Sequence, residues 1–198
     1  MTLLNSLERI TVNNPIRALV QRRVEARWFI AQGGVLPGAK VLELGCGRGV
    51  GAQILFDTFG VRCVDAFDLD PKMVAIAQQK LAFYQDRLRL FVGDATAIDA
   101  PDASYDAVFD FAIIHHIPNW REAIKEVHRV LKPNGKFYAS EVLQKFITHP
   151  LWKRAFHHPQ HDRFDADTFT QALEEQGLAV LATKNLYQQV GIFFAEKR

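Results

Sequence analysis

The folds open to this chain are limited by a glycine-rich loop in the run VLELGCGRG, residues 41–49. An apolar strand pattern at 40–44 precedes the loop, and a helical pattern at 49–59 follows it. Glycine allows a sharp turn and a close approach of the backbone to a ligand. The free N–H groups at a helix start favour an anion such as a carboxylate or phosphate. By itself, however, the loop is also consistent with a plain strand-to-helix turn.

Strand and helix patterns continue to alternate after this loop. Apolar strand patterns occur at residues 62–67, 88–92 and 136–142, and the range 105–114 contains a further strand. Helical patterns occur from 70 to about 83, at 120–131 and at 167–176. Two final strands at 178–184 and 190–196 are joined by a short loop, which predicts antiparallel pairing. The alternation predicts a mostly parallel sheet, whose ligands bind beyond the carboxyl ends of the strands.

Carboxylates follow two of the predicted strands. Asp68 can accept both hydroxyls of a ribose, a geometry that serves a dinucleotide or S-adenosylmethionine equally. Asp70 precedes a proline and is better explained as a helix cap, while Leu69 between them could pack on an adenine. Asp94 could accept a hydrogen bond from the adenine amino group, although such a residue alone is more often part of a turn.

A nicotinamide site is the competing interpretation of the glycine loop. Dinucleotide sites prefer the pattern G-x-G-x-x-G. If the pattern starts at Gly45, Val50 occupies the third glycine position. The observed spacing is G-x-G-x-G, which weakens the case for a nicotinamide oxidoreductase.

Three segments, VLELGCGRG, AFDLDPKMVAIAQ and FVGDATAID, occur in an order that resembles the class I S-adenosylmethionine-dependent methyltransferases. The run YDAVFDFAIIHHIPNWREAIKEVHRVLKPNGKFYASE resembles the fourth strand, helix and fifth strand of that family. The similarity covers residues 38–142. It implies an α/β fold: a Rossmann-like three-layer sandwich whose mostly parallel seven-stranded sheet has an antiparallel last strand. It also implies S-adenosylmethionine as cofactor and S-adenosylhomocysteine as product.

The resemblance also implies which residues contact the cofactor. Glu43 supports the loop or the methionine amino group, Asp68 holds the ribose, and Asp94 holds the adenine amino group. Asp110 is placed to reach the ammonium, although the neighbouring Phe111 is bulkier than is usual there. The full predicted set is Glu43, Gly45, Cys46, Gly47, Gly49, Asp68, Leu69, Asp94, Ala95, Asp110 and Phe111.

A general base is needed only if the acceptor of the methyl group still carries its proton at working pH. His115 and His116 follow the fourth strand and are candidates, since histidine titrates near neutrality. The alternative is a structural role, with at least one ring bonded to the backbone. Glu141, at the end of the fifth strand, is a second candidate base.

The chain is predicted to form one domain over residues 1–198. Its parts are an N-terminal helical cover at 1–35, the cofactor-binding core at 38–142, a lid at 143–165, and the last helix and strand pair at 166–198. The lid prediction depends on its length, since simple connections need only about 2–6 residues, and on its large apolar side chains. These are Phe146, Leu151, Trp152, Phe156 and Phe164.

The predicted cover helix is rich in arginine. Arg23 and Arg27 share one face, and Val20 and Val24 share another. A solvated basic face on a packed helix is the simpler interpretation, and an anionic acceptor or a membrane surface is the alternative. The histidines at 157–161 are interpreted as loop surface, so no metal is expected.

Charge and composition narrow the classes of partner. The chain has 24 Lys and Arg against 22 Asp and Glu. This balance of charge does not provide the excess of basic residues typical of proteins that bind nucleic acid. Two cysteines without a disulfide pattern indicate a cytoplasmic protein, and no apolar run is long enough for integral membrane association. A small-molecule acceptor is therefore expected. The alternatives are an NAD-dependent oxidoreductase and a non-catalytic S-adenosylmethionine-binding protein.

Overall fold

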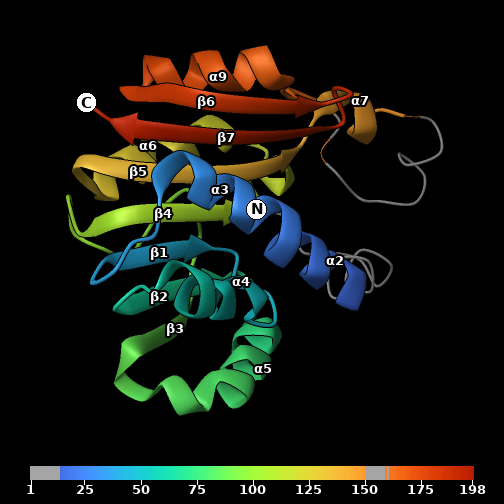
Figure 1. Ribbon diagram of the computed structural model, residues 1–198. Coiled ribbons are helices and arrows are strands. Elements are labelled where there is room, and N and C mark those ends of the chain that lie inside the picture. The colour runs from blue at the N-terminus through green and yellow to red at the C-terminus, as the bar shows by residue number, and fades with distance from the viewer. Residues whose placement is uncertain (1–13, 150–158, 160) are drawn as a thin grey trace.

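The computed structural model describes residues 14–149, 159 and 161–198. Its centre is a seven-stranded sheet in the order β3-β2-β1-β4-β5-β7-β6 (Figure 1). Only β7 runs antiparallel to its neighbours, which confirms the predicted sheet. The strands are β1 (Lys40–Leu44), β2 (Cys63–Asp68), β3 (Leu88–Val92), β4 (Tyr105–Phe111), β5 (Leu131–Val142), β6 (Leu178–Leu186) and β7 (Val190–Lys197).

Three of the described helices begin at a polar side chain that caps a first-turn N–H group: Asn14, Asp70 and Asp165. Asp70 accepts a hydrogen bond from the Lys72 N–H at 2.9 Å, which is the capping role expected for it. The α-helices are α2 (Pro15–Val20), α3 (Ala26–Gly33), α4 (Val50–Ile54), α5 (Pro71–Leu81), α6 (Trp120–Val130), α7 (Gln144–Ile147) and α9 (Ala166–Glu175). The π-helical turns are η1 (Gln21–Glu25) and η2 (Leu55–Phe59), and the 3-10 turns are η3 (Ala82–Arg87) and η4 (Ile114–His116).

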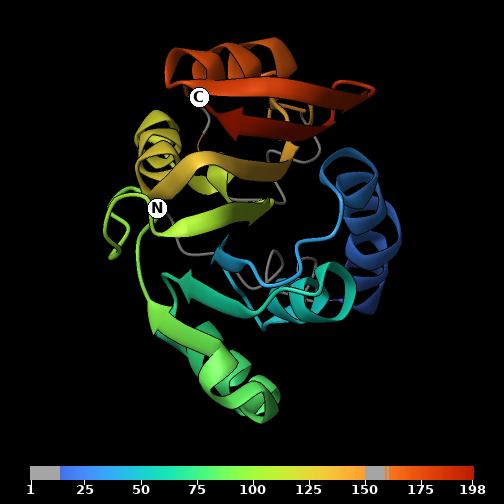
Figure 2. The same cartoon turned by 60° about the vertical axis from the view of Figure 1, so that its left-hand side comes forward.

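Helices cover both faces of the sheet, which gives the three layers (Figure 2). On one face α6 and α9 enclose a core around Trp120 and Phe169. On the other face α3 and α4 enclose a second core, in which Phe109 and Tyr138 stack with ring centroids 4.4 Å apart. Phe29 packs edge-on against Tyr138 at 5.4 Å. This contact fixes the N-terminal helix over β4 and β5, at the edge where the parallel strands end.

Strands four and five show how the structure sets the strand boundaries. Within the predicted range 105–114 the fourth strand ends at Phe111, because Ala112 adopts a φ of +69° and the chain then enters η4. The fifth strand begins at Leu131, five residues earlier than predicted. It includes a turn-like stretch at Asn134, whose φ is +61°. The pairing of this strand with β4 shifts register there, between Tyr105 and Ala107 of β4.

The predicted lid is only partly described. Phe146 lies on α7, whereas Leu151, Trp152 and Phe156 fall outside the described residues. Phe164 is buried in the core, where its ring centroid lies 4.8 Å from that of Trp120. Its expected place on a lid was therefore wrong: its ring fills a gap between α6, α9 and the sheet.

Candidate active site

The glycine loop at residues 45–49 turns between β1 and α4. Gly45, Gly47 and Gly49 have φ values of +66°, +49° and +84°, a region that other residues rarely adopt. No described atom lies within 4 Å of the place of a Cβ on Gly47, whereas a Cβ on Gly45 would come within 2.5 Å of the Ile113 side chain. The loop is therefore open above Gly47 and packed against the segment after β4 at Gly45.

Asp68, at the end of β2, holds this loop in place. One of its oxygens accepts a hydrogen bond from the Gly47 N–H at 2.9 Å, and the other accepts one from the Asp70 N–H at 2.9 Å. Burial raises the pKa of Asp68, and the two backbone donors oppose that shift. Each oxygen keeps a lone pair, so the carboxylate can accept two more hydrogen bonds.

The predicted adenine contacts lie beside Asp68, at the ends of β2 and β3. Asp94 accepts hydrogen bonds from both the N–H and the hydroxyl of Thr96 at 2.8 Å, and so closes a turn. Leu69 and Asp94 are half-buried, and Ala95 is buried. A turn role for Asp94 is thus present, while its contact with an adenine stays a prediction.

Two buried carboxyl groups end β1 and β4. Glu43 and Asp110 are 2% and 0% exposed. Asp110 accepts a hydrogen bond from the Ile113 N–H at 2.9 Å, yet Glu43 Oε2 and Asp110 Oδ2 have no hydrogen-bond partner among the described residues. Burial raises the pKa of both groups well above the ordinary range. Buried polar atoms without partners are costly, so a ligand that brought a donor here would be stabilised.

Cys46 and Phe111 occupy the predicted positions but turn into the protein. The Cys46 thiol is buried, which raises its pKa, so it is a poor nucleophile. The Phe111 ring packs in the core, with its centroid 6.1 Å from that of Phe29. The chain near Phe111 thus presents its backbone, rather than this ring, to the edge of the sheet.

A buried network joins η4 to β5. Glu141 Oε1 accepts a hydrogen bond from the Ile114 N–H at 2.7 Å, and Oε2 accepts one from the His115 N–H at 3.3 Å. The ring atom His115 Nδ1 lies 2.5 Å from the same Oε2. Arg163 donates to the His115 carbonyl at 2.7 Å. His116 is also buried, its ring 4.1 Å from that of His115. Glu141 has the geometry of a group that orients His115, and a base role for these three residues stays a prediction.

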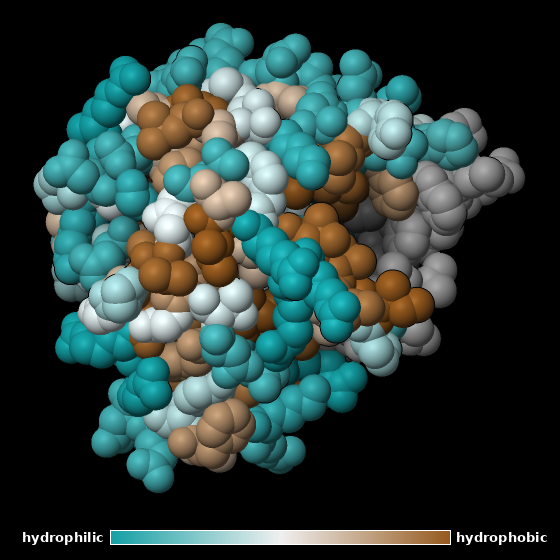
Figure 3. Space-filling model, in the orientation of Figure 1, coloured by the Kyte–Doolittle hydropathy of each residue, from teal (hydrophilic) through white to brown (hydrophobic). Residues whose placement is uncertain are grey.

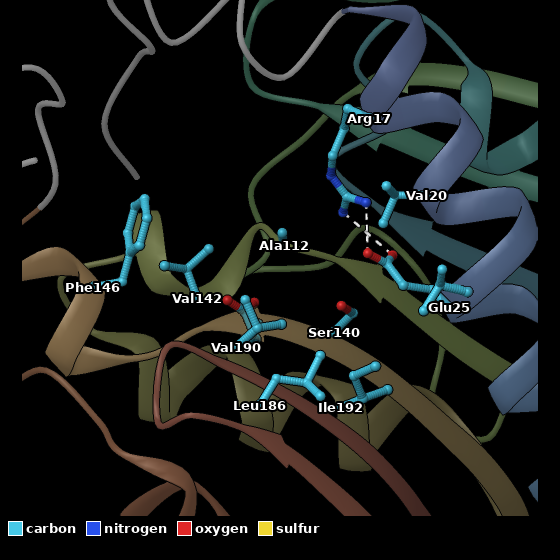
Figure 4. A pocket seen from close by; sticks show the side chains of 12 residues that line it. Arg17, Val20, Glu25, Ala112, Ser140, Val142, Phe146, Leu186, Val190 and Ile192 are labelled. Carbon is cyan, nitrogen blue, oxygen red and sulfur yellow. Dashed lines mark hydrogen bonds and ion pairs between the residues drawn. The ribbon is translucent and has the colours of Figure 1, made fainter.

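An apolar cavity of about 300 Å³ opens beside this network (Figure 4). Helix residues form one wall, Phe146 of α7 stands opposite, and the β6–β7 hairpin forms the floor in this view. Its lining is Arg17, Val20, Val24, Glu25, Ala112, Ser140, Glu141, Val142, Phe146, Leu186, Val190 and Ile192. Ala112 and Glu141 connect the cavity to the ends of β4 and β5, next to Asp110.

The sequence analysis missed Glu25 as a site residue. Glu25 is buried, and Arg17 donates two hydrogen bonds to it at 2.6 and 3.3 Å. Two residues eight positions apart are not fully aligned along an α-helix. The π-helical turn at 21–25 changes the rotation per residue and brings Glu25 onto the side of Arg17. Burial raises the pKa of Glu25, and Arg17 and Ser140 oppose this. The only sequence signal was a glutamate surrounded by arginines.

The described residues contain no group of three His, Cys, Asp or Glu side chains suited to a metal. His157 and His158 of the histidine run lie outside the described residues, and His161 is exposed. No described helix is long and apolar enough to cross a membrane.

A family described as a methyltransferase domain matches residues 41–135. A probable S-adenosylmethionine-dependent methyltransferase of Mycolicibacterium smegmatis is 31% identical over 156 residues, which cover 78% of this chain and 58% of the relative. A demethylmenaquinone methyltransferase of Staphylococcus epidermidis is 30% identical over 144 residues, covering 72% of this chain and 58% of the relative. The chain thus spans less than two thirds of the length of these relatives.

Solved structures agree on the fold. A SAM-dependent methyltransferase from Aquifex aeolicus superposes with a TM-score of 0.75 at 18% identity, covering 96% of this chain and 97% of that one. A methyltransferase of Haloferax volcanii, solved with an activator protein, gives a TM-score of 0.79 at 18% identity and covers 98% and 99%. With the matched glycine loop and sheet order, these comparisons favour a methyltransferase over a nicotinamide enzyme. Over residues 41–135 and in its fold, the chain is therefore similar to the class I S-adenosylmethionine-dependent methyltransferases.

Proposed function

We propose that this protein transfers a methyl group from S-adenosylmethionine to a small-molecule acceptor with an apolar part. The observation that carries the proposal is an open glycine loop held by the carboxylate of Asp68 at the end of β2, with an apolar cavity beside the ends of β4 and β5. S-adenosylmethionine supplies an electrophilic methyl carbon when bound, and the protein supplies position and charge.

The residues present fit this cofactor. Asp110 Oδ2 is an acceptor that would hold an ammonium group, since a buried carboxylate is stabilised by a cation. Glu43 lies on the other face of the sheet, beside Gly51, where it would support the loop. Asp68 has lone pairs left for two hydroxyls of a ribose, and the backbone at Gly47 is open, since no described atom lies within 4 Å of a Cβ placed there. These assignments agree with the roles implied by the family.

The cavity would receive the acceptor. Its lining is mostly aliphatic, which favours an apolar molecule. The relationship to a demethylmenaquinone methyltransferase supports an acceptor of that kind. The protein would hold the acceptor in line with the methyl group and exclude water from it, and such orientation contributes up to roughly 7–11 kcal/mol in the most favourable cases.

If the acceptor carries a proton, we propose His115 as the base that takes it. Its Nδ1 lies beside Glu141 Oε2, and this contact orients the ring. His116 beside it and Glu141 itself are the other base candidates. A non-catalytic binding protein would show cofactor binding without turnover on any acceptor of a panel of quinones, phenols and fatty acids.

S-adenosylhomocysteine should bind and raise the melting temperature. A ligand that binds only the folded state adds about 2.7 kcal/mol at a hundred times its Kd. Thermal shift and calorimetry with S-adenosylhomocysteine and with NAD measure this. Submillimolar NAD binding together with no response to S-adenosylhomocysteine would contradict the proposed cofactor.

Replacing Phe146 by Ala should weaken the use of the acceptor and leave cofactor binding unchanged. Phe146 lines the cavity and is half-buried, and a loss of about 1–2 kcal/mol of apolar contact raises KM roughly 5–30-fold. The matched control is Phe83→Ala, at an exposed ring on η3. The measurement is KM for the best acceptor of the panel beside the S-adenosylhomocysteine thermal shift. Equal KM for both variants would remove the cavity from the reaction.

A further inference from the structure

The N-terminal helix has its polar and apolar sides reversed relative to an ordinary surface helix. Gln21 and Glu25 are buried, whereas Ile16 and Leu19 are 74% and 50% exposed. The α2 segment buries no residue at all. A helix at a protein surface normally turns its aliphatic side chains inward, so this face is suited to contact something beyond the described residues.

The exposed side chains form one continuous stripe. They recur at positions 16, 19, 20, 23, 24 and 27, the spacing of one helical face. The first part of the stripe is aliphatic and ends at Val24, and Arg23 and Arg27 extend it with positive charge. Figure 3 shows hydrophobic side chains gathered over this part of the molecule, with a run of hydrophilic ones between them.

This stripe is continuous with the mouth of the cavity. Val20 and Val24 are part of the exposed stripe and also line the cavity. Across the cavity, Leu186 and Val190 line it from the β6–β7 hairpin, whose turn carries Tyr187 at 87% exposure. An apolar molecule leaving a hydrophobic phase beside the helix would therefore contact aliphatic side chains from the stripe into the cavity.

The charge around the mouth is strongly one-sided. In the segments that surround it, residues 14–33, 143–149 and 178–195, the only acidic residue is the buried Glu25, and the cavity lining adds the buried Glu141 from β5. Their basic residues are Arg17, Arg22, Arg23, Arg27, Lys145 and Lys184. Of these, Arg17 pairs with Glu25 and Arg22 with Asp57, and the other four are exposed.

We infer that this surface docks on an anionic lipid membrane and that the acceptor is an amphiphilic lipid taken directly from it. Aliphatic side chains beside arginines and an exposed tyrosine are the pattern of a helix and a loop that lie in the headgroup region. The basic rim matches the negative charge of anionic lipids. The part concerning the acceptor rests on the proposed function, whereas the docking surface does not.

Vesicle flotation tests the docking surface with the full chain. The protein should bind vesicles of phosphatidylglycerol and phosphatidylcholine, but not vesicles of phosphatidylcholine alone, and should be released by 0.5 M salt, which screens the charge at about that concentration. Ile16→Ser with Leu19→Ser, and separately Arg23→Glu with Arg27→Glu, should each lower the partition coefficient by about tenfold or more. Controls with the same chemistry are Phe83→Ser with Val35→Ser, and Lys72→Glu with Lys125→Glu. Both should stay within about twofold of wild type.

Three outcomes would overturn the inference. They are no binding to anionic vesicles at low salt, equal losses in test and control variants, and a concentration-dependent dimer in sedimentation that Ile16→Ser with Leu19→Ser abolishes. The last would assign the stripe to a second copy of the chain. The thermal shift with S-adenosylhomocysteine, measured on the same samples, tests the proposed cofactor separately from the membrane docking. A normal shift without vesicle binding refutes only the docking. Vesicle binding without a shift refutes only the proposed cofactor.

Discussion

Replacement of Asp68 by Ala should reduce the affinity for S-adenosylhomocysteine by about 100-fold or more. The carboxylate would lose two hydrogen bonds from ribose hydroxyls, each worth about 1.5–3 kcal/mol when one partner is charged. It would also release the N–H groups of Gly47 and Asp70, so the glycine loop would no longer be held against β2. Calorimetric titration of wild type and variant measures the change.

The neighbouring Asp70 provides the matched control. It caps α5 through the Lys72 N–H, so Asp70→Ala should cost about 0.5–2 kcal/mol of stability while leaving cofactor affinity within about threefold. The two variants should thus separate binding from stability at positions two residues apart. An affinity for Asp68→Ala within twofold of wild type would show that the ribose assignment is wrong.

Replacement of Asp110 by Asn should stabilise the free protein at pH 8 and weaken its binding of the cofactor. Burial and the nearby Glu141 raise the pKa of Asp110 in the folded state, whereas an unfolded aspartate ionises near pH ~3.9. The protonated Asp110 therefore contributes stability that is fully present below the pKa of the unfolded state. This contribution is lost as the pH rises through the pKa of the folded state, at up to about 1.4 kcal/mol per pH unit. Wild-type stability should therefore fall between pH 5 and 8, and the variant should flatten part of that decline.

Two further comparisons test the role of the charge. Binding of S-adenosylmethionine to Asp110→Asn should weaken by roughly 10–100-fold through loss of a charged acceptor. Methylthioadenosine, which lacks the ammonium group, should bind both proteins alike. Urea unfolding across pH supplies the stabilities, with the exposed Asp99→Asn as control. Wild-type stability that rises over this pH range, with no change of slope in Asp110→Asn, would contradict the role of the buried acid.

The sequence was sufficient for those features that short-range patterns encode. Alternating strand and helix patterns predicted all seven strands, and the helix start at Asp70 followed from capping chemistry. The glycine positions required by φ values above zero were also visible, since only glycine adopts them readily. These features depend on neighbours within a few residues, so no tertiary information was needed.

Features that depend on distant contacts were not visible. Phe164 looked like a lid residue because nothing in its own segment shows that Trp120 and Phe169 leave a space for it. Glu25 was overlooked because the π-helical turn that directs it inward has no pattern in the sequence. The roles of His115 and Glu141 were equally unclear, since their contact joins residues 26 positions apart.

The placement of β7 has a consequence for the order of folding. This strand follows β6 in the chain but lies between β5 and β6 in the sheet. β6 has no neighbour other than β7, so it cannot join the sheet before β7 is in place. The hairpin formed by β6 and β7 contains mostly local contacts, and such contacts form fastest. It should therefore assemble as a unit and then attach to β5, so that the floor of the acceptor cavity is completed in one late step.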